Sequence, residues 1–187
     1  MEAFKTYIDG LFIIEPKVFD DERGYFYESF NKEEFKQKTG IDFNPVQDNE
    51  SKSMKNVIRG LHFQKSPYAQ AKLVRVIKGE IIDVAVDLRP DSETFGQYVA
   101  VDLSEDNKRQ FFIPKGFAHG FVVLSDEAIF QYKCDEYYHP EAEGGISYKY
   151  VSWKGISNGR IKEEDFILSE KDKNREIISL EELKNSL

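Results

Sequence analysis

Short apolar runs separated by turn residues dominate the chain between residues 57 and 134. These runs are rich in β-branched and aromatic side chains, and Gly, Pro or Asn recurs between them about every ten residues, which is typical of strands joined by turns. No helix-length pattern separates the runs, which argues against a parallel α/β sheet. We therefore expect an all-β fold, either a sandwich or a barrel. The predicted strands are residues 11–14, 25–30, 57–64, 72–77, 80–88, 97–103, 110–113, 121–124 and 129–134.

Helical signals lie on either side of this β pattern. Residues 31–40 predict a helix, because Asn31 can cap its start and Glu34 occupies the reciprocal capping position. Gly40 suits the left-handed residue that ends many helices. A second capping box at residues 179–182 predicts a short terminal helix.

The remaining segments are mainly polar. Residues 47–53 and 143–145 have loop composition, and residues 146–153 are a candidate last strand. The chain has no internal repeat, low-complexity tract or linker. Residues 1–187 are therefore expected to form one domain.

Composition narrows the class of protein. The formal net charge of −8 disfavours a nucleic-acid surface, because phosphate backbones need clustered Lys and Arg. A single nucleotide needs only a few local cations. The one cysteine, Cys134, excludes an internal disulfide and fits a reducing compartment. The chain has no apolar run of membrane-spanning length and its first residues do not read as a signal peptide, so we expect a cytoplasmic protein with no membrane segment.

The apolar stretch 57–64 carries two residues that a plain core strand lacks, Arg59 and His62. Histidine titrates near neutrality and suits general acid–base chemistry. A lone histidine in a strand is nevertheless more often a hydrogen-bonded core residue than a catalyst. Strict strand alternation would also place Arg59 and His62 on opposite faces, unless Gly60 marks a bulge that re-aims one of them.

Alternation along residues 80–88 places Asp83 and Asp87 on one face of the strand and apolar residues on the other. The apolar face is core. Buried carboxylates need partners, so the face with Asp83 and Asp87 fits either a polar cavity inside a barrel or a structural network with Lys and Arg. The pattern leaves both readings open.

A Pro-x-Gly-x-x-His spacing ends at His119 and would deliver this histidine at the start of an apolar strand. The spacing is one of the two motifs of cupin jelly rolls, many of which bind a metal. The other motif has two closely spaced histidines and a Glu, whereas this chain offers only His62 there. A stable metal site needs three or more ligands, so we expect no metal. Tyr132 is either an ordinary strand aromatic or a proton donor in the same cavity.

Seven ordered motifs together resemble the dTDP-4-dehydrorhamnose 3,5-epimerases, a family of cupin-type sugar-nucleotide epimerases. The resemblance covers most of residues 11–145 and implies a cupin-type jelly roll (double-stranded β-helix) with a few short peripheral helices. It also implies a homodimer formed partly by N-terminal strands, and a reaction that needs no metal or redox cofactor. The motifs are residues 15–19, 21–24, 46–49, 59–64, 69–75, 83–89 and 114–121.

The resemblance implies a substrate of the dTDP-4-dehydro-6-deoxyglucose type, a nucleotide-linked 4-keto-6-deoxyhexose. Its C3 and C5 hydrogens are acidic because they lie beside the C4 ketone. His62 matches the general base that removes such a proton, and Tyr132 matches the acid that returns one from the opposite face. Asp172 matches a carboxylate that fixes the tautomer of the base.

Other positions match groups that bind the substrate. Arg59 and Lys72 match cations near the C4 oxygen, where enolate charge develops. Tyr138 matches an aromatic side chain that stacks on the nucleotide base. The remaining matches to substrate-binding positions are Arg23, Glu28, Gln47, Asp48, Asn49, His119, Glu143 and Lys171.

The chain departs from the family pattern between Gly145 and Phe166. Where the family has Trp-Asn-Asp-Pro and then Ile-x-Trp-Pro, this chain reads Ile-Ser-Tyr-Lys-Tyr and Val-Ser-Trp-Lys-Gly. One alternative is therefore epimerisation of another nucleotide-linked keto-sugar (GDP- or UDP-linked, including a keto-heptose), or inversion at a single carbon. A metal-dependent cupin and a non-catalytic sugar-binding jelly roll are alternatives of other classes. The presence of both His62 and Tyr132 speaks against the binding module, which needs no acid–base pair.

Overall fold

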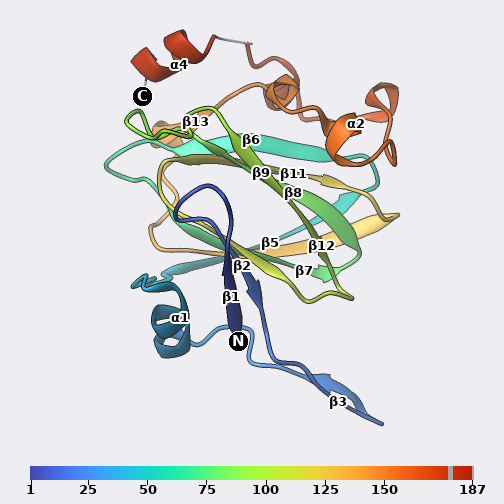
Figure 1. The fold of residues 1–187 in the computed structure, drawn as a ribbon. Helices are drawn as coiled ribbons and strands as arrows, with labels where there is room; N and C mark the ends of the chain where they lie inside the picture. The colour runs from blue at the N-terminus through green and yellow to red at the C-terminus, as the bar shows by residue number, and fades with distance from the viewer. Residues whose placement is uncertain (177–178, 187) are drawn as a thin grey trace.

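Two antiparallel sheets face each other in the computed structural model, which describes residues 1–176 and 179–186 (Figure 1). In spatial order, the six-stranded sheet consists of β1 (Glu2–Lys5), β2 (Phe12–Glu15), β10 (Gln110–Ile113), β7 (Lys72–Lys78), β12 (Glu127–Cys134) and β5 (Gln47–Met54). The five-stranded sheet consists of β13 (Glu143–Gly145), β6 (Ile58–Gln64), β11 (Phe117–Val123), β8 (Glu80–Asp87) and β9 (Tyr98–Ser104). Consecutive strands repeatedly alternate between the sheets, which is the jelly-roll arrangement predicted from the sequence.

The main core fills the space between the two sheets, and the alternation of β8 shows how it forms. Ile81 and Ala85 point inward and pack with apolar residues of the facing sheet, such as Val74 and Phe130. The opposite face of β8 is also buried, but in a second cluster on the outer side of the five-stranded sheet. Both faces of β8 therefore exclude water, which explains its nearly continuous apolar sequence.

The segment after β13 covers that outer face (Figure 1). Trp153 is 2% exposed and packs there with strand residues such as Val84 and Val122. The segment consists of short elements, namely η1 (Pro140–Ala142), η2 (Tyr148–Tyr150), α2 (Trp153–Ile156), η3 (Glu163–Asp165), α3 (Glu170–Lys173) and α4 (Leu180–Ser186).

Two predictions for this segment were wrong. Residues 146–153, all of which the structure describes, contain no strand, because their apolar side chains face the sheet from above instead of pairing with its edge. Residues 143–145, expected to be a loop, form β13, since the small residues Gly144 and Gly145 allow the backbone to lie close against β6.

Both predicted helices are present. In α1 (Lys32–Thr39) the side chain of Asn31 accepts a hydrogen bond from the Glu34 backbone, and Gly40 takes the left-handed conformation with φ of 78°. The capping box of α4 also forms, because Ser179 and Glu182 exchange backbone and side-chain hydrogen bonds. Within residues 1–176 and 179–186, no helix is long and apolar enough to cross a membrane.

Residues 47–53 were predicted to be a polar loop, but they form most of β5. This strand lies at the edge of the six-stranded sheet and pairs with β12 along its whole length. Its side chains are almost all polar, because one face borders the cavity described below and the other faces solvent. A strand without an apolar face carries no hydrophobic alternation, which is why composition indicated a loop.

The hairpin of β3 (Phe19–Asp21) and β4 (Gly24–Phe26) extends away from the two sheets (Figure 1). The predicted strand over residues 25–30 therefore ends at Phe26. Phe19, Tyr25 and Phe26 are each more than half exposed, which is unusual for three neighbouring aromatic side chains.

Candidate active site

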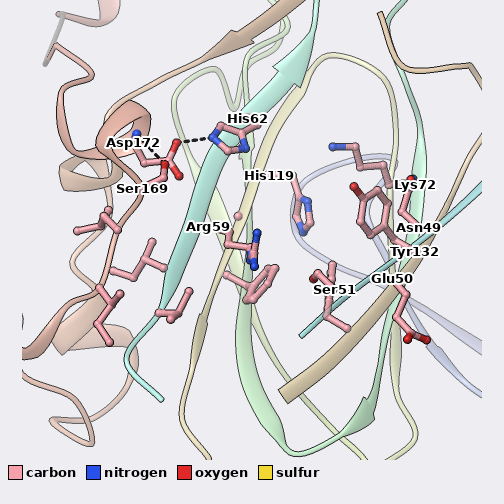
Figure 2. A pocket seen from close by; sticks show the side chains of 17 residues that line it. Asn49, Glu50, Ser51, Arg59, His62, Lys72, His119, Tyr132, Ser169 and Asp172 are labelled. Carbon is pink, nitrogen blue, oxygen red and sulfur yellow. Dashed lines mark hydrogen bonds and ion pairs between the residues drawn. The ribbon is translucent and has the colours of Figure 1, made fainter. Parts of the chain in front are cut away.

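A cavity of about 530 Å³ opens between the two sheets, a size that fits a small-molecule ligand. Both sheets line it, together with the start of α3, so residues far apart in sequence meet there (Figure 2). Seven of the predicted site residues lie in its wall: Asn49, Arg59, His62, Lys72, His119, Tyr132 and Asp172.

A bulge in β6 brings Arg59 and His62 to the same cavity. His62 lies opposite His119 in the register with β11, whereas Arg59 lies opposite Phe121. The stretch from Arg59 to His62 is one residue longer than the stretch of β11 that it pairs with. This extra residue is a β-bulge, and it lets side chains on both sides of it point to the same face of the sheet. The bulge that the sequence offered as an explanation is present at Gly60.

Gly60 is required by the close approach of β6 and β11 at this bulge. Its φ of 130° lies in the region that favours glycine, and a Cβ atom there would lie 2.6 Å from the Cα of Gly120. Gly120 is equally restricted, because its own Cβ would lie 2.6 Å from the Arg59 carbonyl oxygen. Gly60 and Gly120 therefore allow β6 and β11, the strands that carry His62 and His119, to pack closely beside the cavity.

His62 and Asp172 form a hydrogen-bonded pair at one side of the cavity (Figure 2). The His62 Nε2 and Asp172 Oδ1 atoms are 2.5 Å apart, so Nδ1 of the imidazole remains available to the cavity. Burial alone would raise the pKa of Asp172, but the hydrogen bond and charge of His62 outweigh it and lower this pKa. Asp172 is therefore a carboxylate when it holds the imidazole.

Backbone contacts fix Asp172 beside β6. The chain enters the cavity wall at Ile167, whose carbonyl accepts a 2.9 Å hydrogen bond from the Ile58 backbone. Ser169 then caps α3, and its Oγ accepts a hydrogen bond from the Asp172 backbone N–H. A residue 110 positions after His62 is thereby held against its ring.

Tyr132 and Lys72 approach from the facing sheet, on β12 and β7 (Figure 2). Burial raises the pKa of the Tyr132 phenol, with Arg59 acting in the opposite direction, so the hydroxyl stays protonated near neutrality. Burial lowers the pKa of Lys72, whose Nζ lies 5.7 Å from the centre of the Tyr132 ring. His62 and Tyr132 therefore reach one cavity from opposite sheets.

His119 forms a second histidine–carboxylate pair with Asp83. Its Nε2 lies 2.9 Å from both carboxylate oxygens, and Asp83 is fully buried. Burial raises the pKa of Asp83, opposed by the charge of His119. Asp87, the other carboxylate on this face of β8, belongs instead to a structural network with Arg89, and its pKa is lowered to about 2. Asp87 thus fits the structural-network reading, whereas Asp83 meets the cavity only through its partner His119.

Four further predicted site residues form a connected group beside the cavity. The Gln47 side-chain oxygen accepts from the Tyr138 backbone, and the Tyr138 hydroxyl donates to Glu143 over 2.7 Å. Lys171 also donates to Glu143. Asp48 is exposed and pairs with Lys133 on the outer side of β5 and β12, so its side chain points away from the cavity.

Arg23 and Glu28 are not among the described residues that line the cavity. Arg23 lies at the turn of the projecting hairpin, and its guanidinium pairs with the neighbouring Asp21. Glu28 follows the hairpin and is exposed. Within one chain, these two predicted substrate contacts are separate from the other residues of the site.

Sequence reasoning missed several cavity residues. Glu50 and Ser51 line it from β5, which was taken for a loop. Ser169 lines it beside Asp172, and its Ser-x-x-Asp spacing was a usable capping signal. No group of three or more His, Cys, Asp or Glu side chains is arranged to hold a metal ion in residues 1–176 and 179–186.

Comparison with known proteins assigns the family. A model of the dTDP-4-dehydrorhamnose 3,5-epimerases matches residues 5–179. The chain belongs to this family. The epimerase family and isomerase class expected from the sequence motifs are confirmed, and so is the cupin-type jelly roll.

Relatives of similar length carry the same family name. A dTDP-4-dehydrorhamnose 3,5-epimerase of Methanothermobacter thermautotrophicus is 55% identical over 170 residues, 91% of this chain and 90% of the relative. The Escherichia coli enzyme of that name is 51% identical, over 98% of this chain and 96% of its own. A crystal structure of the Legionella pneumophila dTDP-6-deoxy-D-glucose-3,5-epimerase, in complex with dTDP-4-keto-L-rhamnose, is 50% identical with a TM-score of 0.87, and the match covers 97% of this chain and 96% of that one.

Proposed function

We propose that this epimerase inverts C3 and C5 of dTDP-4-dehydro-6-deoxyglucose to give dTDP-4-dehydrorhamnose. The observation that carries the proposal is the placement of His62 and Tyr132 on opposite sheets around one cavity. A sugar ring lying between the sheets would present one face to each side chain. Removal of a proton from one face and delivery of another proton to the opposite face inverts the carbon.

His62 is the base in this proposal. Asp172 accepts a hydrogen bond from the Nε2–H of the imidazole, which leaves the lone pair of Nδ1 free toward the cavity. The carbon–hydrogen bond beside the C4 ketone breaks, its electron pair moves into the enolate, and the proton passes to Nδ1. The Asp172 carboxylate then stabilises the imidazolium that forms.

Cations in the cavity wall stabilise the enolate oxygen. Arg59 reaches the cavity from β6, where its Nε also donates to Ser53 over 2.9 Å, so the guanidinium is held in place. Lys72 reaches it from β7. A cation in this partly buried cavity stabilises negative charge that develops on the C4 oxygen more strongly than it would in bulk water.

Tyr132 is the acid. Burial keeps its phenol protonated, so the proton is available until the enolate forms. Transfer of this proton to the carbon from the face opposite His62 completes the inversion. The phenolate then recovers a proton from solvent, and the His62 imidazolium releases its proton to solvent.

The direct test is incubation with dTDP-4-dehydro-6-deoxyglucose in D₂O, followed by NMR. We expect deuterium at both C3 and C5, and Tyr132→Phe should retain exchange while losing inversion. Exchange at one carbon would make the chain a single-site epimerase. No exchange with this sugar, but exchange with a GDP- or UDP-linked keto-sugar, would overturn the dTDP assignment.

We also propose that the active form is a homodimer in which the β3–β4 hairpin reaches the cavity of the second copy. The exposed aromatic side chains of the hairpin need a cover, and a second copy would also bring Arg23 and Glu28 to a substrate. Mixing Arg23→Ala with His62→Ala tests this, because a mixed dimer would contain one intact site. Recovery of activity is expected, whereas an inactive mixture of verified mixed dimers would contradict the exchange of hairpins.

Residues 1–187 would act as a single epimerase domain, since both sheets and the C-terminal segment contribute to one cavity. A nucleotide-sugar substrate and the free buried thiol of Cys134 fit a cytoplasmic enzyme. Fractionation of the native cells tests this location.

A further inference from the structure

Arg175 lies just after α3 and contacts the carboxylate that holds His62. Its Nε is 3.9 Å from Asp172 Oδ1, and its Nη2 is 3.5 Å from Glu143 Oε1. The side chain is only 17% exposed. Nε is buried, and no atom of residues 1–176 and 179–186 accepts a hydrogen bond from it. An arginine held mostly out of solvent between two carboxylates loses part of its hydration, so its position needs a reason.

The guanidinium packs against Gly145, which lies directly opposite His62 in the pairing of β13 with β6. A Cβ atom on Gly145 would come within 2.5 Å of the Arg175 Cζ and 2.6 Å of the Leu61 carbonyl oxygen. Because Gly145 has no side chain, the Arg175 guanidinium can occupy the space next to the His62–Asp172 pair.

Several charged groups surround this pair. Asp172 meets His62 from β6 and Arg175 from its own segment, and a backbone hydrogen bond from Gly60 lowers its pKa further. Glu143 on β13 interacts with His62, and the Lys171 hydrogen bond lowers the Glu143 pKa against the effect of burial. Besides His62 and Asp172, the titratable or charged groups that line the cavity are Glu50, Arg59, Lys72, His119 and Tyr132.

We propose that Arg175 is a positioning residue that holds the Asp172 carboxylate toward His62 and offsets part of its negative charge. The role of His62 as the base belongs to the proposed function, on which this inference rests. Arg175 itself does not line the cavity and acts only through Asp172 and Glu143.

The sign of the effect follows from charge. Asp172 and Glu143 place two negative charges near His62, and the Arg175 cation offsets part of that charge. Without the Arg175 cation, the His62 imidazole should stay protonated to higher pH. The acidic limb of the activity profile would then move to higher pH.

The decisive measurement is a ¹⁵N NMR titration of histidine-labelled, substrate-free protein. The chain has three histidines, so single substitutions assign each signal. We expect Arg175→Met to move the His62 titration upward by about half to one pH unit, because the cation is close but shared with Glu143. Arg175→Gln carries the same expectation, whereas Arg175→Lys, which retains the charge, should move it by much less.

Arg160→Met is the matched control, because Arg160 also bridges two carboxylates, Glu80 and Asp102, but lies on the surface. It should leave the His62 titration unchanged. Folded neutral variants of Arg175 with a wild-type titration would overturn the proposal. So would unfolding of both neutral variants while Arg175→Lys stays folded, since that pattern indicates a structural role alone.

The kinetic readout separates this inference from the proposed function. If the wild-type protein exchanges the sugar protons, Arg175→Met should lower kcat/KM by about 3- to 10-fold on the acidic limb, the fold-change that corresponds to the same shift. If the wild-type protein exchanges nothing, the proposed function fails, but the substrate-free titration still decides whether Arg175 controls the charge at His62.

Discussion

His62 and His119 lie opposite each other in the register of β6 and β11, yet their aspartates come from different parts of the fold. Asp83 is on β8, the neighbouring strand of the same sheet, whereas Asp172 arrives from the C-terminal segment. The His119 side chain is 8% exposed, and the His62 side chain is 32% exposed.

The difference separates two uses of one chemical pair. A histidine and carboxylate on adjacent strands are locked by the sheet and suit a fixed hydrogen-bonding role toward a ligand. His62 lies at the boundary between the sheet and a separate segment, so it is accessible. Its partner Asp172 has a lowered pKa, and an accessible histidine beside such a carboxylate suits a side chain that takes up and releases protons.

The largest difference is expected from removing each imidazole. His62→Ala should lower deuterium exchange at C3 and C5 by about 10³-fold or more, because it removes the proposed base. His119→Ala should cost about 10-fold, mainly through KM, because it removes only a proposed interaction with bound substrate. NMR of the sugar in D₂O measures both. Equal losses would remove the distinction between the pairs.

The aspartates should repeat this difference on a smaller scale. Asp172→Asn presents the wrong partner to Nε2 and should lower kcat by about 10²-fold. Asp83→Asn should lower it by less than about 10-fold, since the His119 ring keeps its packing inside the sheet. Steady-state kinetics on folded variants gives the comparison, and a greater loss in Asp83→Asn would reverse it.

The bulge that aligns both histidines can be broken at Gly60. Gly60→Ala should lower the free energy of unfolding by about 2–3 kcal/mol, because the new methyl group meets the Gly120 backbone. Gly24→Ala is the matched control, since Gly24 also has positive φ, at 121°, but no described atom beyond its two chain neighbours lies within 4 Å of the position that a Cβ would take there. It should cost only about 1 kcal/mol. Urea denaturation measures both variants, and equal costs would show that the close approach is not limiting.

The smallest effect is in pH dependence, where the two aspartates should behave oppositely. The pKa of Asp172 is lowered from 3.8 on folding, so its stabilisation is present above pH 3.8 and lost as pH falls through the lower folded value. The pKa of Asp83 is raised, so its stabilisation is present below pH 3.8 and lost as pH rises through the higher folded value. Between pH 3 and 6, the destabilisation by Asp172→Asn should grow and that by Asp83→Asn should shrink. Denaturation series across this range test the signs, and parallel trends would contradict them.

Hydrophobic pattern alone predicted the central strands well, because their inward faces carry the core. It failed at β5, whose polar side chains face a cavity and solvent, and at β13, where two glycines replace any alternation. At residues 146–153 the pattern predicted a strand that is absent. Apolar side chains that cover a sheet from outside give a hydrophobic pattern similar to that of a strand.

The site was only partly accessible from the sequence. The two acidic residues on one face of β8 predicted buried polar groups, but the sequence did not show that they have different partners. In the fold, Asp83 pairs with His119 and Asp87 pairs with Arg89. Asp172 was proposed from the resemblance alone, since no local pattern links it to His62. No local sequence pattern pointed to Arg175, because its guanidinium fits only where Gly145, a residue of β13 far from it in the sequence, has no side chain.

The attachment of Asp172 to the C-terminal segment has a consequence for how the protein is made. A ribosome synthesises β6 and its histidine 110 residues before it reaches Asp172. All strands of both sheets, which end with β13 at Gly145, precede that point. The nascent jelly roll can therefore assemble while the proposed base still lacks its carboxylate partner, and the His62–Asp172 pair can form only after Asp172 has emerged.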